Sequence, residues 1–260
     1  MSDWLDEMIQ WAEKYGFSQL IIPHDKQELM KITAMQYGCG RVTELPEAIS
    51  NLTNLTYMSF VKNRLTSLPE SIGDLKNLEM LLLHTNKLTK LPESISSLSS
   101  LNYLNLVGNQ LTELPESIGN LGISNISTLN LGKNKLTKLP ESIGELSKIT
   151  HLMLSNNKLT ELPESIGNLT NLVSLNLSHN KLTALPESIG NLSKLNHLIV
   201  SHNNLTTLPA SFCNLTNLVK LNMSNNKFSD IPDIVGNLPN LIELDKQTTE
   251  QFLQQHIDIY

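Results

Sequence analysis

Leucine and isoleucine recur along most of this 260-residue chain at fixed positions of a short repeated unit. Nine units fill residues 32–240, and successive units start 23 residues apart except for one step of 25 between Leu101 and Ile126. Residues 122–125 hold the two extra positions, just before a predicted strand, so we expect a bulge in a connecting loop that leaves Leu129 and Leu131 in register. The segment Leu-Pro-Glu-Ser-Ile-Gly returns at residues 68–73, 114–119, 139–144, 162–167 and 185–190.

Each unit predicts a short strand and an irregular return path. In residues 101–106, Leu104 and Leu106 alternate with outward-facing neighbours, which is the period of a strand. Proline follows leucine in most units, as at Pro115, and excludes a regular strand or a long helix there. We therefore expect the return path to be extended or 3₁₀. One unit cannot bury its own apolar face, whereas a stack of units buries a continuous core, so the pattern predicts a curved solenoid.

Written generically, the unit reads L-x-x-L-x-L-x-x-N-x-L-T-x-L-P-x-x-I-x-x-L-x-x, which resembles the leucine-rich repeat family over about four-fifths of the chain. Its second half, L-P-x-x-I-x-x-L, is similar to the 23-residue subclass of Ras-associated, Scribble-like and bacterial leucine-rich repeat proteins. The near-identity of successive units is a feature associated with bacterial members. The resemblance implies an α/β solenoid (horseshoe) with a parallel concave sheet, an extended or 3₁₀ convex side, and helical caps at both ends.

One asparagine recurs beside the leucine core of nearly every unit. A buried polar side chain must be hydrogen-bonded or it costs about 1–3 kcal/mol, and the resemblance implies a ladder in which each side chain bonds the backbone of adjacent turns. We interpret the many Asn-Leu-Thr and Asn-Leu-Ser triplets as products of the repeat rather than as glycosylation sites. The predicted structural asparagine ladder is Asn63, Asn86, Asn109, Asn134, Asn157, Asn180, Asn203 and Asn226.

The two ends of the chain depart from the repeat and are predicted to cap the stack. Residues 1–31 form the expected N-terminal helical cap, with a helix over 3–15 that Gly16 ends and a second short helix that starts at Asp25. Trp4 and Trp11 lie in the first of these helices, and their interpretation as packing onto the first unit is preferred over a partner-binding helix. Residues 241–260 form the expected C-terminal cap, with an unfinished strand and a short helix, because Thr248 and Gln251 have capping-box spacing.

The charge and composition of the chain exclude some classes of function. The formal net charge is −6, and because both ends are acidic, residues 32–240 hold equal numbers of acids and bases. This balance argues against binding nucleic acid through bulk electrostatics. No apolar run is long enough to span a membrane, and the acidic N-terminus does not match a secretory signal, so we expect a cytoplasmic protein. Export by a leaderless route remains the alternative.

The sequence offers little catalytic chemistry. It contains no phosphate-binding glycine loop and no His-Glu-x-x-His or Cys-x-x-Cys motif. Cys39 and Cys213 lie seven units apart, about 34 Å at the spacing of parallel strands, which is too far for a disulfide. His179 and His202 occupy one column on adjacent units, but two imidazoles without a carboxylate or thiolate make a weak metal site. We therefore expect no enzyme, no catalytic residue, no metal and no cofactor.

The variable strand positions carry the functional prediction, because they line the concave face on which such solenoids bind partners. Units two to four are rich in apolar side chains at these positions, and an exposed apolar cluster often marks an interaction site. We expect a monomeric, non-catalytic scaffold that binds a protein or peptide. We expect it to bind no nucleic acid and to have no membrane span. The alternative is a bacterial effector or surface protein that binds a host protein. The predicted contact residues are Tyr57, Val61, Met80, Leu82, His84, Tyr103, Asn105, Val107, His151, Met153, His197 and Ile199.

Overall fold

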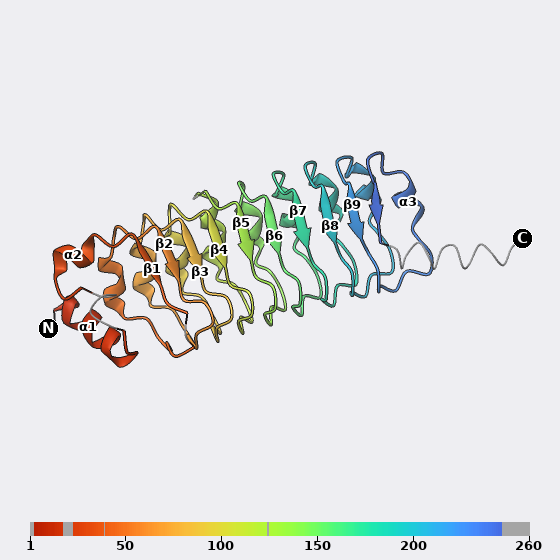
Figure 1. The fold of residues 1–260 in the computed structure, drawn as a ribbon. Coiled ribbons are helices and arrows are strands. Elements are labelled where there is room, and N and C mark those ends of the chain that lie inside the picture. The colour runs from red at the N-terminus through yellow and green to blue at the C-terminus, as the bar shows by residue number, and fades with distance from the viewer. Residues whose placement is uncertain (1–2, 18–22, 39, 124, 246–260) are drawn as a thin grey trace, which may run out of the picture.

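The computed structural model describes residues 3–17, 23–38, 40–123 and 125–245. Within this part of the chain, ten short parallel strands form one sheet whose order follows the sequence. They lie side by side along an elongated stack, with α1 and α2 at one end and α3 near the other (Figure 1). The strands are β1 (Ala34–Gln36), β2 (Tyr57–Ser59), β3 (Met80–Leu82), β4 (Tyr103–Asn105), β5 (Thr128–Asn130), β6 (His151–Met153), β7 (Ser174–Asn176), β8 (His197–Ile199), β9 (Lys220–Asn222) and β10 (Glu243–Leu244).

Short 3₁₀ helices form the return path of the first eight units, as the leucine-proline step predicts. Each begins directly after a proline, whose ring cannot continue a regular strand. In the ninth unit a single α-helical turn, α3 (Asp233–Gly236), takes the place of the 3₁₀ helix. The 3₁₀ helices are η1 (Glu47–Asn51), η2 (Glu70–Asp74), η3 (Glu93–Ser97), η4 (Glu116–Gly122), η5 (Glu141–Glu145), η6 (Glu164–Asn168), η7 (Glu187–Asn191) and η8 (Ala210–Asn214).

The core lies between the sheet and the 3₁₀ helices and consists mainly of leucine and isoleucine. The central residue of nearly every strand points into this core, and most core side chains are fully buried. The two-residue insertion lengthens η4 and leaves Ile123 exposed. Leu129 and Leu131 are both buried, and β5 pairs with β4 in register. The leucine register therefore continues, as predicted, and the lengthened 3₁₀ helix takes up part of the extra length.

The asparagine column forms a continuous series of hydrogen bonds beside the core. Asn157 accepts from the Leu136 backbone N–H of the preceding unit at 3.0 Å through its carboxamide oxygen. Its amide nitrogen donates to the carbonyl oxygens of Leu131 and Leu154, each at 3.0 Å. The other seven asparagines accept from the preceding unit in the same way, so each amide ties two successive turns together.

A second ladder runs along the starts of the 3₁₀ helices. The proline before each helix has no side chain that can accept from the free N–H groups of the first turn. The glutamate of the preceding unit accepts instead: Glu47 Oε2 lies 3.2 Å from the Ser71 backbone nitrogen, and Glu164 Oε2 lies 3.1 Å from that of Ser188. The carboxylate of one turn therefore caps the helix of the next at η2, η3, η6, η7 and η8.

Helices α1 (Trp4–Lys14) and α2 (Lys26–Met30) precede the first strand, close to their predicted positions. The Asp25 carboxylate accepts from the Glu28 backbone N–H at 2.9 Å, so Asp25 caps the start of α2. Gly16 follows α1 with a φ of 73°, the left-handed conformation that ends many helices. The helix predicted after Thr248 lies outside the described residues, and the boundaries of the two caps stay predictions.

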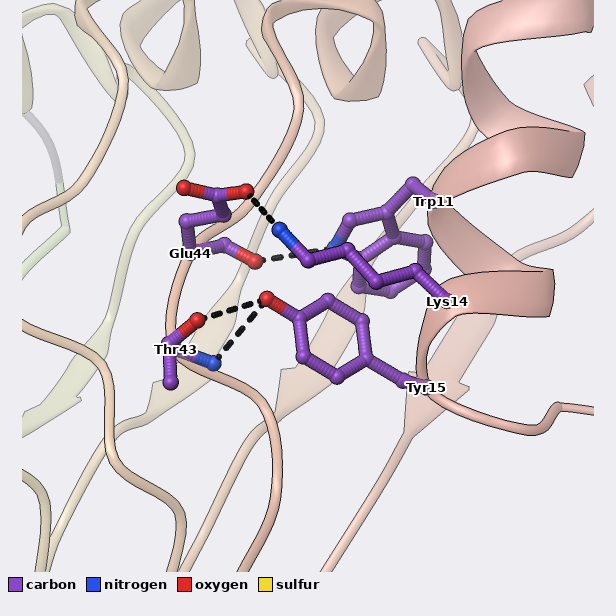
Figure 2. A network of polar contacts seen from close by, with 5 residues as sticks. All are labelled: Trp11, Lys14, Tyr15, Thr43 and Glu44. Carbon is purple, nitrogen blue, oxygen red and sulfur yellow. Dashed lines mark hydrogen bonds and ion pairs between the residues drawn. The ribbon is translucent and has the colours of Figure 1, made fainter.

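Helix α1 is attached to the first unit by aromatic packing and by polar contacts. The Trp11 ring lies 6.1 Å from Tyr37 and 6.0 Å from Phe60, measured between centroids, and Tyr37 and Phe60 replace the usual leucine of their units. Burial raises the pKa of the Tyr37 hydroxyl. Figure 2 shows the polar side: Trp11 Nε1 donates to the Glu44 carbonyl at 2.8 Å, and Lys14 forms an ion pair with the Glu44 carboxylate. These contacts favour packing over partner binding as the role of Trp11.

Candidate functional site

The outward face of the sheet presents two side chains from most strands. In β4, Tyr103 and Asn105 point outward and are half-buried, while Leu104 between them is fully buried. Strand residues two apart share a face, so these outward positions form columns that cross the strands. The predicted contact residues lie in these columns or just beyond the strands. All of them are half-buried except His151, which is exposed.

The structure brings the apolar residues of units two to four together. Tyr57 pairs with Met80, and Met80 pairs with Tyr103, so these three side chains occupy one column on consecutive strands. Leu82 lies beside Met80 on the same face. Together with Val61 and Val107, which follow β2 and β4, they form a surface that we call the apolar stripe: Tyr57, Val61, Met80, Leu82, Tyr103 and Val107.

The predicted residues of the later units do not form such a surface. Met153 and Ile199 lie on β6 and β8, and Asn176 of β7 separates them. His151 and His197 are separated in the same way by Ser174. Polar side chains therefore interrupt this half of the face.

One column that the repeat pattern places on the sheet face is less accessible than expected. Ser178, Ser201 and Ser224 follow their strands by two residues and are buried. The Ser178 hydroxyl donates to the Asn176 side-chain oxygen at 2.8 Å, and the Ser178 backbone nitrogen lies 3.0 Å from the same oxygen. Ser224 bonds to Asn222 in the same way, and the burial of all three serines makes them poor candidates for contact with a partner.

His84 lies at the edge of the apolar stripe and has an unusual environment. Its Nδ1 atom is buried and has no hydrogen-bond partner among the described residues. Partial burial lowers the pKa of the His84 imidazole, and the positive charge of Lys62 lowers it further. The neutral ring is therefore favoured, and His84 extends the apolar surface more than it adds charge.

His179 and His202 stack on each other, with ring centroids 4.0 Å apart and ring planes 11° from parallel. The nitrogen lone pairs of two parallel rings lie in separate planes and do not converge on a single ion. His202 Nε2 also lies 3.1 Å from the Asn225 side-chain nitrogen. Among the residues that the structure describes, no group of three or more His, Cys, Asp or Glu side chains could hold a metal.

Two sequence models of leucine-rich repeats match the chain, one over residues 53–111 and one over residues 93–179 and 165–257. The chain belongs to the leucine-rich repeat family. This confirms the family resemblance and the predicted solenoid; the 23-residue subclass stays a prediction. No curated protein matches the chain. In the part of the chain that the structure describes, no helix is long and apolar enough to cross a membrane.

Several solved leucine-rich repeat structures are similar to the chain. A leucine-rich repeat protein of Leptospira interrogans is 29% identical, with a TM-score of 0.76 over 93% of this chain and 68% of that one. An internalin of Listeria monocytogenes is 27% identical, with a TM-score of 0.72 over 85% of this chain and 62% of that one. The plant peptide hormone receptor RGFR1, solved in complex with RGF2, is 28% identical, with a TM-score of 0.62 over 84% of this chain and 40% of the receptor.

Proposed function

We propose that this leucine-rich repeat protein is a non-catalytic scaffold that binds a protein or peptide on the concave face of its sheet. The apolar stripe carries the proposal. Six apolar side chains remain partly hydrated on one end of a regular sheet, and only the apolar surface of a partner would remove them from water. The sheet is held by the core and the asparagine ladder, so binding requires little ordering on the side of the scaffold.

Tyr57 and Tyr103 are the expected anchors. Tyrosine is enriched among the residues that dominate binding energy, because it offers a large apolar ring with a polar tip. Both side chains are half-buried in the free protein, so a partner would bury them further. The structure of RGFR1 in complex with RGF2 provides a related example of a repeat protein with a bound ligand.

The Tyr57→Ala, Tyr103→Ala double variant tests this proposal. The intact protein serves as bait in lysate of the source cell, and the affinity of each purified captured protein is then measured by calorimetry. The double variant should bind its partner at least about 2 kcal/mol more weakly, the scale of a binding hot spot, with little change in melting temperature.

The matched control is Thr128→Ala, Ser174→Ala, which truncates two half-buried residues of the same column in the polar half of the face. The control should bind like the intact protein. Loss of binding in the control alone would place the site toward the C-terminal half and contradict the proposal.

Our proposal places the protein in the cytoplasm as a monomer. The alternative is a bacterial effector or surface protein exported without a cleavable leader, and the similarity to two bacterial proteins, one of them an internalin, is the reason to test it. Fractionation of the source cell distinguishes the two: recovery in the cytoplasm supports the first, whereas recovery at the surface or in the medium supports the second.

A further inference from the structure

A line of positive charge runs along the edge of the sheet at which the strands end. Just after each of β2 to β9 the chain turns through a residue with positive φ and then reaches the ladder asparagine, and the next residue is exposed to solvent in most units. That solvent-exposed residue is basic on most units: Arg41, Arg64, Lys87, Lys135, Lys158 and Lys181.

Three further lysines strengthen this line, which we call the basic edge. Lys62 and Lys133 occupy the positive-φ position of units two and five, and Lys227 extends the line to unit nine. The six-residue segments that form the edge, such as 61–66 and 132–137, contain no aspartate or glutamate in any of the nine units. Nine of the 19 basic residues therefore lie on one edge of a molecule with a net charge of −6.

These charges are not neutralised within the described part of the chain. All nine side chains are exposed, and none of them forms an ion pair with a described residue. Lys135 Nζ donates to the side-chain oxygen of Gln110 at 2.9 Å, a neutral partner. By contrast, Lys14 and Lys31 in the N-terminal cap are both paired with glutamates. The basic edge thus has free charge available for a ligand.

The basic edge adjoins the apolar stripe at units two to four. The Lys62 backbone nitrogen donates to the His84 carbonyl at 3.0 Å, and Thr85 donates to the Val107 carbonyl at 2.7 Å, so edge and stripe meet on adjacent turns. Lys62 of the basic edge also directly follows Val61 of the apolar stripe in the chain. One ligand can therefore contact both surfaces.

We propose that the basic edge docks an acidic segment of the partner protein, while apolar residues of that segment lie on the apolar stripe. This inference rests on the proposed function and adds the charge of the partner to it. The basic edge from unit one to unit seven spans about 29 Å at the spacing of parallel strands, which an extended segment of about nine residues would cover. Alternate side chains of such a segment face opposite sides, so acidic and apolar residues can reach the two surfaces separately.

A protein partner fits the observations better than a nucleic acid. The remaining surface is acidic, with a glutamate at the start of seven consecutive 3₁₀ helices, and it would repel a phosphate backbone. Single-stranded nucleic acids also bind on aromatic side chains beside the cations. In units five to seven, the strands β5 to β7 and the basic edge contain no aromatic residue other than histidine. Tyr57 and Tyr103 lie beside the cations only in units two and four, so most of the edge offers no tyrosine ring for a base to stack on.

Fluorescence anisotropy with the full chain tests this inference. The probe is a fluorescein-labelled peptide of alternating glutamate and leucine, about ten residues long to match the length of the edge. A peptide of alternating lysine and leucine and an oligothymidylate of equal charge serve as comparison probes. The acidic peptide should bind most tightly, and its affinity should fall as salt rises from about 20 to 150 mM, because exposed charges are screened.

The decisive variant is Arg64→Glu, Lys87→Glu, which should weaken binding of the acidic peptide by about tenfold or more. Its control is Lys148→Glu, Lys194→Glu, which makes the same change in net charge at two exposed lysines that precede β6 and β8, at the opposite edge of the sheet. The control should change the affinity less than about twofold, as expected for a long-range effect alone. The melting temperature of each variant shows whether the fold is retained.

Three results would overturn the inference: no binding of the acidic peptide, equal weakening by the two charge variants, or tighter binding of the oligonucleotide. Tyr57→Ala, Tyr103→Ala separates it from the proposed function. If this double variant no longer binds the peptide while the edge variant binds normally, the proposed role of the basic edge is wrong and that of the apolar stripe is supported. If only the edge variant no longer binds the peptide, the proposed role of the apolar stripe is wrong and that of the basic edge is supported.

Discussion

The Glu7 carboxylate of α1 accepts a hydrogen bond from the Ala48 backbone N–H of η1 at 3.2 Å. Ala48 is the second residue of its 3₁₀ helix, as Ser71 is in η2, and Glu47 accepts from Ser71 at the same distance. Glu7 thus stands where a preceding repeat would place its own glutamate. The N-terminal cap covers the apolar core and also continues the hydrogen bonding of the solenoid.

Glu7→Ala should therefore destabilise the protein by about 0.5–2 kcal/mol, the cost of removing a helix cap, because the Ala48 N–H loses its acceptor. Glu13→Ala is the control, since Glu13 is exposed on the same helix and should change stability by less than about 0.5 kcal/mol. Urea denaturation of both variants provides the measurement. Similar losses would show that α1 helicity, rather than the bond to Ala48, sets the effect.

The glutamates that cap the 3₁₀ helices also make the stability of the protein depend on pH. The backbone N–H and the side chain of Ser211 lower the pKa of Glu187 below its usual value of 4.5, and the Ala210 N–H contributes as well. A lowered pKa means that this stabilisation is complete above about pH 5 and is lost as the pH falls through the lowered value. Glu187→Gln should reduce stability at pH 7 and flatten the acid limb of a plot of stability against pH.

Glu113→Gln controls for the loss of one negative charge. Glu113 is exposed and has no hydrogen bond to a described residue, so its replacement should leave the acid limb unchanged. An unchanged limb in Glu187→Gln as well would show that the capping bonds at η8 do not persist in solution.

Much of this fold follows from the sequence because the repeat states each structural requirement several times. Leucine at period two predicts the strands, proline after leucine predicts the 3₁₀ return, and a lone polar residue among leucines predicts the asparagine ladder. The connection between Glu7 and Ala48 could not be predicted, because it depends on how α1 packs against a segment some 40 residues away. Tyr37 and Phe60 were a usable signal, since aromatic residues take the place of leucine at these two adjacent positions, against which Trp11 packs.

Only some features of the sheet face could be predicted from the sequence. The column of Tyr57, Met80 and Tyr103 follows directly from the repeat register, because neighbouring parallel strands place equivalent residues side by side. The burial of Ser178 and Ser201 did not follow from the repeat register, because it depends on the turn that comes after each strand. The basic edge is visible in the sequence as a lysine or arginine after the ladder asparagine. The structure adds that these side chains are exposed and form no ion pair with a described residue.

Another prediction concerns serines of the 3₁₀ helices. The Ser165 hydroxyl is buried and has no partner among the described residues, whereas the equivalent Ser117 hydroxyl donates to the Glu93 carbonyl at 2.9 Å. Replacing an unsatisfied buried hydroxyl removes a desolvation cost of about 1–3 kcal/mol, partly offset by lost packing. Ser165→Ala should thus be neutral or stabilising, and Ser117→Ala should cost about 0.5–1.5 kcal/mol. Thermal unfolding of the pair checks this, and equal destabilisation would mean that Ser165 finds a partner in solution.

The positive-φ turn after each strand offers a test in which two substitutions to glycine should change the stability of the protein in opposite directions. Thr85 adopts a φ of 60°, which is strained for a β-branched residue, while Gly108 adopts 68° at the equivalent position of the next unit. Thr85→Gly should stabilise the protein by up to about 1 kcal/mol, because relief of strain exceeds the added entropy of the unfolded chain. Thr112→Gly, at an exposed site where φ is not positive, should instead destabilise it by roughly 0.5–1 kcal/mol.

Gly108→Ala completes this comparison. A Cβ atom at Gly108 would meet its nearest neighbour, Thr85 Cα, at 3.6 Å, an ordinary contact, so any loss of stability reports backbone strain rather than a clash. We expect that loss to be about 1–2 kcal/mol in urea denaturation. If Thr85→Gly and Gly108→Ala both destabilised the protein, side-chain contacts of Thr85 would outweigh its strain. If neither changed stability, the backbone after each strand would relax away from positive φ, and the turn that presents the basic edge would be less fixed than the structure shows.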